Sequence, residues 1–344
     1  MNTETFRKNR NRVTIADVAH HAGVSKMTVS RVINQKGEIT EATRRKVLDA
    51  MDELGFRPNR IARSLATDKT LRIGLVVPSL TNQYFGAILE GAEILLWEHG
   101  YHILLCHTGG DPNREQAVMD IFEDHRVDGV IVLSASSSSE AMNECLSRQR
   151  AAVVINTEVD PQFAARIYTD EIKSMALAVN HLIESGRRHL GYVHFDIHTY
   201  ANHERYRGFE AALKNAGFAF DAEKQTRATQ PYDPTMTQVI SELLQTDPKI
   251  DGLVCFNSGI AARALQACAQ LGRRVPDDVA VIGYDDIFMA ELTIPSLTTV
   301  DLELPKEEVG ALAAQMLLKR IENDDIQQED VILEHKLIVR GSAP

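Results

Sequence analysis

The sequence predicts an α/β protein: a small N-terminal domain of three helices, followed by two α/β lobes with parallel sheets. Two observations carry this prediction. Residues 14–55 contain three helical patterns with a tight turn between the first two. From Leu71 onward, short apolar runs alternate with helical runs, which is typical of parallel sheets covered on both faces. This second stretch, about 270 residues, is long for one sheet, so two similar lobes with a cleft between them fit it better.

The first two helical patterns predict a helix-turn-helix. Thr14 is a suitable N-cap for the first helix, and Gly23 can take the left-handed conformation that a tight turn needs. Ser25 caps the second helix, whose Val29, Val32 and Ile33 are expected to face inward. In this motif the N-terminal residues of the second helix reach base edges in the major groove of DNA.

The outward side chains of the second helix are of types that bind bases and phosphates. Arg31 can bond guanine through two hydrogen bonds, Lys26 can reach guanine or phosphate, and Met27 or Thr28 can contact a thymine methyl group. A small helical bundle without a ligand is the alternative. The expected DNA contacts in this domain are Thr14, Ser25, Lys26, Met27, Thr28, Ser30, Arg31 and Asn34.

A third helix is predicted between Thr40, which caps it, and Gly55, which ends it. Its expected apolar face consists of Val47, Leu48, Met51 and Leu54. This helix would hold the other two in place.

Charge separates the N-terminal segment from the rest of the chain. Residues 1–72 hold 15 Lys and Arg against 8 Asp and Glu, whereas the remaining residues hold 22 against 40; the whole chain carries −11. A basic segment suits the neutralisation of phosphates, and the acidic remainder would be repelled by DNA. Contact with DNA is therefore expected only in the N-terminal segment.

The elements of the two lobes can be placed from the apolar runs. Strands are predicted at 72–77, 102–106, 129–133, 152–155, 189–193, 252–255 and 279–282. Helices between them include 84–99, 175–184 and 206–215, each followed by a glycine.

Polar and aromatic side chains gather where ligands bind in open α/β sheets, beyond the carboxyl ends of strands. Asn82, Tyr84 and Phe85 lie in or just after the loop that follows the first strand, and Asn156 directly follows another. The remaining candidates are Asn257 and Asp285 after later strands, Arg205 at the start of the helix over 206–215, and Tyr232 in a loop bounded by prolines. Each has a structural alternative. Asp285 could cap the next element, Arg205 could form an ion pair with Asp285 or Glu204, and the two asparagines Asn156 and Asn257 could be turn residues.

Together these motifs resemble the lactose/galactose-repressor (LacI/GalR) family of bacterial transcription regulators. The matching segments, in family order, are TIADVAHHAGVS, TVSRVIN, RPNRIARSL, IGLVVPSLTNQYF, RRHLGYVH, ERYRGFEAAL, VIGYDDI and IPSLTTV. They extend from Val13 to about Gly341. The resemblance implies a helix-turn-helix domain over 1–56, a hinge helix and linker over 57–70, and a periplasmic-binding-protein-like effector and dimerisation domain over 71–344.

The resemblance also implies how the lobes and the hinge are built. The chain would cross between the lobes three times, with lobe 1 over about 71–169 and 302–330 and lobe 2 over about 170–301 and 331–344. In the family the segment from Asn59 to Leu65 is helical on DNA, and Leu65 matches a position that enters the minor groove. Asn59, Ala62 and Leu65 are therefore further expected DNA contacts. A helix of seven residues is too short to be stable alone, so DNA and a partner would order it.

In the family the eight cleft candidates are effector contacts: Asp285 and Arg205 would bond neighbouring hydroxyls of a polyol, and the aromatic residues would face its ring. The chain departs from the family at Ser258, where Asp is usual, and at Asn156, where Asp is frequent. Two short segments resemble gluconate-type repressors. We expect a sugar or sugar acid as effector; a purine or another metabolite is the alternative.

The remaining patterns argue against other classes of protein. We find no dinucleotide-binding or phosphate-binding glycine motif, and the histidines are too scattered for a metal site, so no catalytic residue, cofactor or metal is expected. A periplasmic sugar-binding protein would share the lobes but would need an export signal. The four cysteines are spaced like reduced residues of a cytoplasmic protein. No membrane span is expected.

The sequence therefore predicts a transcriptional regulator, more specifically a repressor, of a bacterial cytoplasm, associated with the nucleoid when it binds DNA. It is expected to be a homodimer on a near-palindromic operator.

Overall fold

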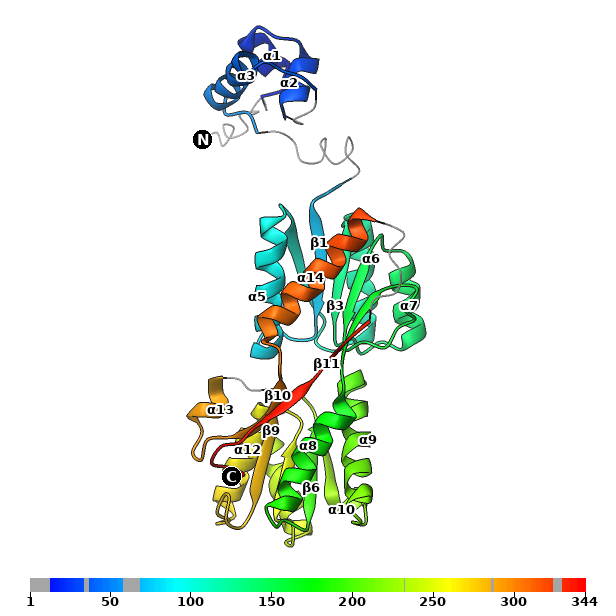
Figure 1. Ribbon diagram of the computed structural model, residues 1–344, viewed down its shortest axis with the longest axis vertical. Helices are drawn as coiled ribbons and strands as arrows, with labels where there is room; N and C mark the ends of the chain where they lie inside the picture. The colour runs from blue at the N-terminus through cyan, green and yellow to red at the C-terminus, as the bar shows by residue number, and fades with distance from the viewer. Residues whose placement is uncertain (1–12, 34–36, 58–68, 232, 286–287, 324–329) are drawn as a thin grey trace, which may run out of the picture. The chain divides into compact units, whose positions relative to one another are not determined.

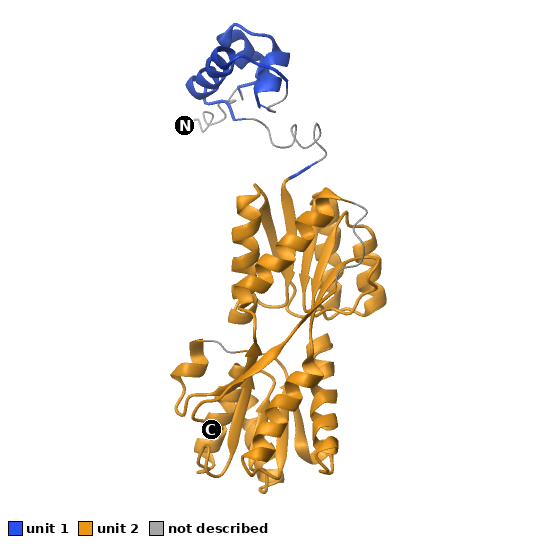
Figure 2. Ribbon diagram, viewed as in Figure 1, with its two compact units in different colours: residues 1–70 blue, residues 71–344 orange. Residues whose placement is uncertain are grey.

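The structure is a computed structural model that describes residues 13–33, 37–57, 69–231, 233–285, 288–323 and 330–344. The chain forms two compact units, residues 1–70 and residues 71–344 (Figure 2). Among the described residues, no helix combines the length and the apolar character needed to cross a membrane.

Unit 1 contains the three predicted helices, α1 (Ile15–Ala22), α2 (Lys26–Ile33) and α3 (Glu41–Glu53). A capping box between Thr14 and Asp17 begins α1, and Gly23 ends it with a φ of 66°. Val18, Val29 and Val47, one from each helix, form the centre of the core and are inaccessible to solvent. Leu48 was assigned wrongly to the apolar face of α3: half of its surface is exposed, because that face is narrower than the sequence suggested.

Unit 2 begins with lobe 1, a six-stranded sheet in the order β11-β5-β4-β3-β1-β2 (Figure 1). All of its strand pairs are parallel. One face carries α5 (Gln83–Glu98) and α14 (Lys306–Glu322), and the other carries α6 (Pro112–Asp124) and α7 (Ser139–Ser147). The strands are β1 (Arg72–Val77), β2 (His102–His107), β3 (Gly129–Leu133), β4 (Ala152–Ile155), β5 (Ala165–Thr169) and β11 (Asp330–Leu333).

Lobe 2 repeats this plan in a six-stranded sheet of order β12-β10-β9-β8-β6-β7, in which only the β10–β12 pair is antiparallel. Helices α8 (Glu171–Glu184) and α9 (Tyr200–Asn215) cover one face, and α11 (Met236–Thr246) and α12 (Ser258–Gln270) the other. The strands are β6 (Leu190–Phe195), β7 (Thr226–Thr229), β8 (Gly252–Cys255), β9 (Ala280–Tyr284), β10 (Thr298–Leu302) and β12 (His335–Ile338); α10 (Ala222–Gln225) and α13 (Phe288–Leu292) are short.

The chain passes between the lobes after β5, after β10 and after β11. The last passage follows Leu333, later than the expected boundary at residue 330, because Val331 pairs in register with Ile167 of lobe 1. Leu302 ends β10 and so belongs to lobe 2, where the sequence had placed it in lobe 1. Helix α9 also begins earlier than expected, at Tyr200 after its cap Thr199, so that Arg205 lies inside the helix.

Two glycines allow α5 and α14 to cross at very short range. A β-carbon on Gly91 would lie 1.8 Å from the backbone oxygen of Glu307, and one on Gly310 would lie 1.9 Å from that of Ile88. Both obstacles are backbone atoms, so a side chain at either position would push the helices apart. This crossing packs the helix that follows the second inter-lobe passage onto lobe 1.

We predict that Gly310→Ala destabilises the protein by about 1–3 kcal/mol or more, because the added methyl group overpacks the crossing. The matched control is Gly86→Ala on α5, where nothing lies within 4 Å of the added carbon. Gly86→Ala should be neutral or stabilising by up to about 1 kcal/mol. Urea unfolding measures both; equal effects of the two variants would contradict the close crossing.

Candidate functional site

The exposed face of α2 carries the side chains expected to contact DNA. Lys26 and Arg31 are exposed, and Met27 has 64% of its surface accessible. Val29 and Val32, on the opposite face, are buried in the core of unit 1. The helix therefore presents two cations and one apolar side chain on a surface held by three helices.

Other expected DNA contacts have structural roles in unit 1. The Ser25 hydroxyl accepts a hydrogen bond from the Thr28 amide at 3.0 Å and lies 2.9 Å from the Thr28 hydroxyl. The Thr14 hydroxyl lies 2.7 Å from the Asp17 carboxylate in the capping box. Ser30 is half-buried. Asn34, Asn59, Ala62 and Leu65 lie outside the described residues.

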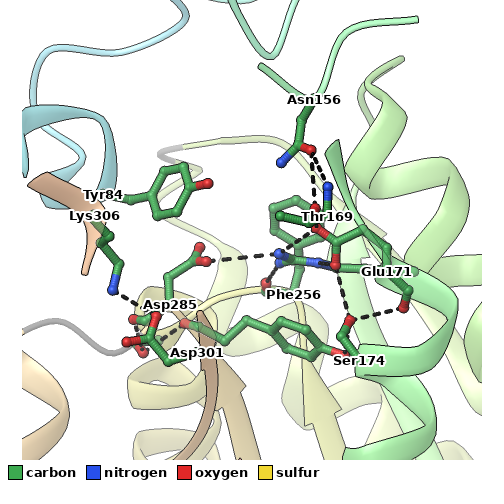
Figure 3. A network of polar contacts seen from close by, with 12 residues as sticks. Tyr84, Asn156, Thr169, Glu171, Ser174, Phe256, Asp285, Asp301 and Lys306 are labelled. Atoms are coloured by element: carbon green, nitrogen blue, oxygen red, sulfur yellow. Dashed lines mark hydrogen bonds and ion pairs between the residues drawn. The ribbon is translucent and has the colours of Figure 1, made fainter. Parts of the chain in front are cut away.

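Arg205 is the centre of a buried polar network in unit 2 (Figure 3). Its Nε and Nη2 donate to the two carboxylate oxygens of Glu171 at 2.8 and 3.1 Å, and its Nη1 donates to the carbonyl oxygen of Phe256 at 2.6 Å. Asp285 lies farther away, with its Oδ1 at 3.8 Å from Nη2. An ion pair was one alternative for Arg205, but its main partner is Glu171, at the start of α8, and not Asp285 or Glu204.

Two aromatic rings lie against the Arg205 guanidinium. The ring centres of Tyr284 and Phe256 are 4.1 and 4.8 Å from its central carbon. Cation–π contacts of this kind restrict the group to one position. Arg205 is thus fixed by its stacking as well as by its hydrogen bonds.

Asn156 and Thr169 extend the network from lobe 1 to Glu171. The Asn156 side-chain oxygen accepts a hydrogen bond from the Thr169 amide at 2.9 Å, and the Thr169 hydroxyl lies 2.7 Å from Glu171 Oε1. Asn156 is buried and has a φ of 48°, in the left-handed region that asparagine tolerates. The network therefore follows the first passage between the lobes, from β5 to α8.

Asp285 follows β9 with a φ of 61°. Ser258 at the start of α12 holds this turn, since its hydroxyl lies 2.8 and 2.9 Å from the carbonyl oxygens of Tyr284 and Asp285. Burial raises the pKa of Asp285 to about 6, against the opposing effects of Arg205 and Lys306. Ser258, where the related family usually has Asp, therefore positions a carboxylate instead of supplying one.

Burial alone would also raise the pKa of Glu171, but the adjacent Arg205 outweighs it and lowers that pKa to about 2. Glu171 is consequently ionised at neutral pH. The two carboxylates around Arg205 thus differ: Glu171 is a firmly charged partner, and Asp285 gains its charge only near neutral pH.

Lys306, at the start of α14, and Tyr84, on α5, bring lobe 1 to the other side of Asp285 (Figure 3). The Lys306 ammonium lies 2.6 Å from Oδ1 of Asp301 on β10, and both side chains are largely buried. Burial raises the pKa of Tyr84 strongly, and the negative charge of the nearby Asp285 raises it further. The phenol therefore stays neutral.

Three other candidates have structural roles, and one is not described. Asn82 caps α5 by accepting a hydrogen bond from the Tyr84 amide at 3.0 Å, and Asn257 caps α12 by accepting one from Ile260 at 2.9 Å. Phe85 packs partly against the core of lobe 1. Tyr232 lies outside the described residues. Each cap uses only the side-chain oxygen, so the amide nitrogen of the same group remains the part that can donate to a ligand.

A pocket of about 510 Å³ opens beside this network between the lobes. Tyr168 of lobe 1 and Tyr200 of lobe 2 form an aromatic pair in its wall, with ring centres 5.1 Å apart. Among its charged residues, Glu204 pairs with Arg207 at 2.8 Å, whereas Arg166 pairs with Asp330 of β11 outside the pocket wall. Residues of both lobes therefore line this pocket.

Sequence reasoning missed Glu171, Thr169 and Lys306, and it noted Ser258 only as a departure from the family. Glu171 follows a half-buried strand, β5, that was not predicted, so nothing placed its carboxylate beside Arg205. A signal was present, because an acid one residue after the cap of a helix is a common arrangement, but it does not distinguish a solvated helix start from a buried ion pair.

Known proteins resemble both units of the chain. Residues 14–59 match the model of bacterial regulatory proteins of the lacI family, and residues 179–343 match a periplasmic binding protein-like domain. The HTH-type transcriptional regulator RegA of Clostridium saccharobutylicum is 34% identical over 334 residues, which cover 96% of this chain and 98% of RegA. The chain belongs to the lacI family of bacterial regulatory proteins. The family resemblance seen in the sequence is thereby confirmed.

Other transcriptional regulators match this chain over nearly its whole length. The HTH-type transcriptional repressor PurR of Vibrio vulnificus is 32% identical, over 96% of this chain and 98% of that repressor. A structure of the transcriptional regulator CelR in complex with cellobiose aligns over 96% of this chain and 100% of CelR, with 30% identity and a TM-score of 0.70. The lac repressor dimer bound to operator, at 24% identity and a TM-score of 0.84, shows the same fold.

As a lacI-family member, the chain is a DNA-binding transcriptional regulator with a small-molecule effector, and its relatives are named as regulators, not as enzymes. The predicted fold class, a helix-turn-helix domain followed by two α/β lobes, is confirmed. The individual site residues stay predictions.

We predict that Asp285 makes the unfolding free energy depend on pH. Its folded pKa of about 6 exceeds its ordinary value of 3.8, so the folded state holds the proton more tightly. The resulting stabilisation is present below pH 4 and is lost as the pH rises to about 6, at most about 3 kcal/mol for a shift of this size. Relative to Asp285→Asn, the unmodified protein should therefore be more stable at pH 4 than at pH 7 in denaturant titrations. A difference that stays constant over this range would contradict the assignment.

Proposed function

We propose that this regulator represses transcription as a homodimer on a near-palindromic operator and responds to a sugar or sugar acid bound between the lobes. The observation that carries this proposal is the buried network around Arg205 and Asp285. In this network the Phe256 carbonyl holds the Arg205 guanidinium after β8, and the Ser258 hydroxyl holds the backbone of Asp285 after β9. A pair of this kind suits neighbouring hydroxyls, which both donate and accept hydrogen bonds.

The DNA half of the proposal is supported by the exposed face of α2. Lys26 and Arg31 are cations on a helix that the family uses for binding DNA, and Met27 adds an apolar contact. The DNA contacts of Asn34, Asn59, Ala62 and Leu65 remain predictions from the family resemblance. We propose that the hinge expected over 57–70 connects operator binding with the state of the lobes.

The homodimer is supported by exposed apolar side chains on α5 and α13, two helices that lie on the same side of unit 2 in Figure 1. Trp97 on α5 has 62% of its surface exposed, and Leu292 on α13 has 63%. Further exposed apolar side chains on these two helices, or next to them in sequence, are Ile94, Phe288, Met289 and Ile294. Exposed apolar side chains that gather on one surface mark an interaction site, and the lac repressor, which has the same fold, binds its operator as a dimer.

The effector half of the proposal is supported by hydrogen-bond donors and aromatic rings at the starts of α5 and α12 and beside Arg205. The amide nitrogens of Asn82 and Asn257 can donate to ligand hydroxyls, and Tyr84 and Phe256 offer apolar ring faces. A purine is the second candidate, because the same rings would stack on a flat base. Effector coupling to DNA in such regulators is typically about 1–3 kcal/mol.

We predict that Arg31→Ala weakens operator binding by about 1–3 kcal/mol and relaxes the preference at one base position, because a bidentate base contact is lost. Arg45→Ala, which removes an exposed cation from α3, should reduce binding less and without a change in base preference. Fluorescence anisotropy with operator variants measures both. An equal loss on operator and on random DNA would argue against base recognition by Arg31.

We predict that Trp97→Glu raises the dimer dissociation constant by at least about tenfold, since it places a charge in an apolar contact. The control Ile332→Glu changes a similarly exposed residue on β11, the edge strand of the lobe 1 sheet opposite to β2. This variant should leave the dimer intact. Sedimentation velocity distinguishes the two. If only Ile332→Glu dissociates the dimer, the interface lies at β11 and not at α5.

We predict that Asp285→Asn leaves operator affinity unchanged without effector and abolishes the effector response. The substitution keeps the shape of the side chain but removes the charge that would accept hydrogen bonds from ligand hydroxyls. Operator titrations with and without an effector found by thermal-shift screening provide the measurement. A preserved response would show that the effector binds elsewhere.

A further inference from the structure

We infer that Glu171 determines effector specificity: by pairing with Arg205 inside the protein, it makes the proposed effector site around Arg205 and Asp285 bind uncharged polyhydroxylated ligands and reject carboxylates and phosphates. This inference rests on the proposed function, because it concerns the same site. It narrows the expected effector from sugars and sugar acids to neutral sugars.

The first argument is the geometry of the guanidinium. Arginine recognises a carboxylate through two parallel N–H groups on one edge of its planar fork. In Arg205 the edge formed by Nε and Nη2 is occupied by both oxygens of Glu171. On the other edge, Nη1 donates to the carbonyl oxygen of Phe256, and Nη2 faces Asp285. Neither edge offers two N–H groups to a carboxylate from outside.

The second argument is that Glu171 cannot easily give way to a ligand. Its side chain is inaccessible to solvent and lies at the start of α8, fixed by the passage from β5. The hydroxyls of Thr169 and Ser174 lie 2.7 and 3.1 Å from its carboxylate oxygens. An anionic ligand that took its place on Arg205 would leave this buried carboxylate without its cation, which is strongly unfavourable.

The third argument is the balance of charge. In the described part of the network, the cations Arg205 and Lys306 face three carboxylates, those of Glu171, Asp285 and Asp301. An anion entering beside Asp285 would meet like charge in a largely buried setting, where screening is weak. A ligand hydroxyl, in contrast, can donate to Asp285 and accept from Arg205, and it adds no charge.

The effect of removing the charge of Glu171 follows from the same contacts. In Glu171→Gln the side chain keeps its length, but Arg205 loses the partner that neutralises it. A carboxylate on the ligand could then supply the missing charge. The variant should shift the preference of the cleft toward acids, whereas Glu204→Gln removes a neighbouring carboxylate that pairs with Arg207 and should not.

The test compares matched neutral and acidic ligands on the full chain. The pairs are D-ribose with D-ribonate, D-glucose with D-gluconate, and cellobiose with cellobionate, first in thermal-shift assays and then in calorimetry for any member that binds. In the unmodified protein we expect the neutral member of a binding pair to bind at least about tenfold more tightly than its acid. Glu171→Gln should reduce this ratio at least about tenfold, and Glu204→Gln should leave it unchanged.

The outcomes separate the inference from the proposed function. Equal or tighter binding of an acid by the unmodified protein would overturn the inference while leaving a sugar-type effector in place. An unchanged ratio in a folded Glu171→Gln variant would overturn the role of Glu171. If that variant does not fold, the ratio in the unmodified protein decides alone. If no member of any pair changes the melting temperature, the proposed effector class is contradicted and this inference with it.

Discussion

The buried ion pair between Glu171 and Arg205 is the interaction on which the arrangement of the cleft depends. Glu171 stands at the first passage between the lobes, and Arg205 lies inside α9 against the ends of β8 and β9. A buried pair of this kind is weak evidence for added stability, because desolvation offsets the attraction, but losing one partner is costly. Its consequence here is fixed geometry: Phe256, Tyr284 and Asp285 are all positioned around one guanidinium.

Much of the fold could be predicted from the sequence, because its central strands are continuous apolar runs. β1, β3, β4 and β8 have the bounds that the apolar runs predict. The missed strands, β5, β7, β10, β11 and β12, are mostly edge or half-buried strands in which polar residues alternate with apolar ones. Their pairing is decided by neighbours distant in the sequence, as when Val331 pairs with Ile167, and a local pattern does not contain that information.

The site was predictable at the level of residue types but not of partners. Arg205, Asp285 and Asn156 gather in one network. Asn82 and Asn257 cap helices, which is a structural role. The sequence showed Ser258 as a departure from the family but not that its hydroxyl holds the backbone of Asp285, nor that Glu171 from another helix pairs with Arg205. These contacts join residues that are distant in the sequence, so a local pattern does not contain them.

The most direct test of this account is a crystal structure of the full chain with a ligand that shifts its melting temperature. The account predicts that both Glu171 oxygens remain on Nε and Nη2 of Arg205 and that ligand hydroxyls lie between Arg205 and Asp285. A structure in which a ligand carboxylate or phosphate occupies that edge of Arg205, with Glu171 displaced, would contradict it.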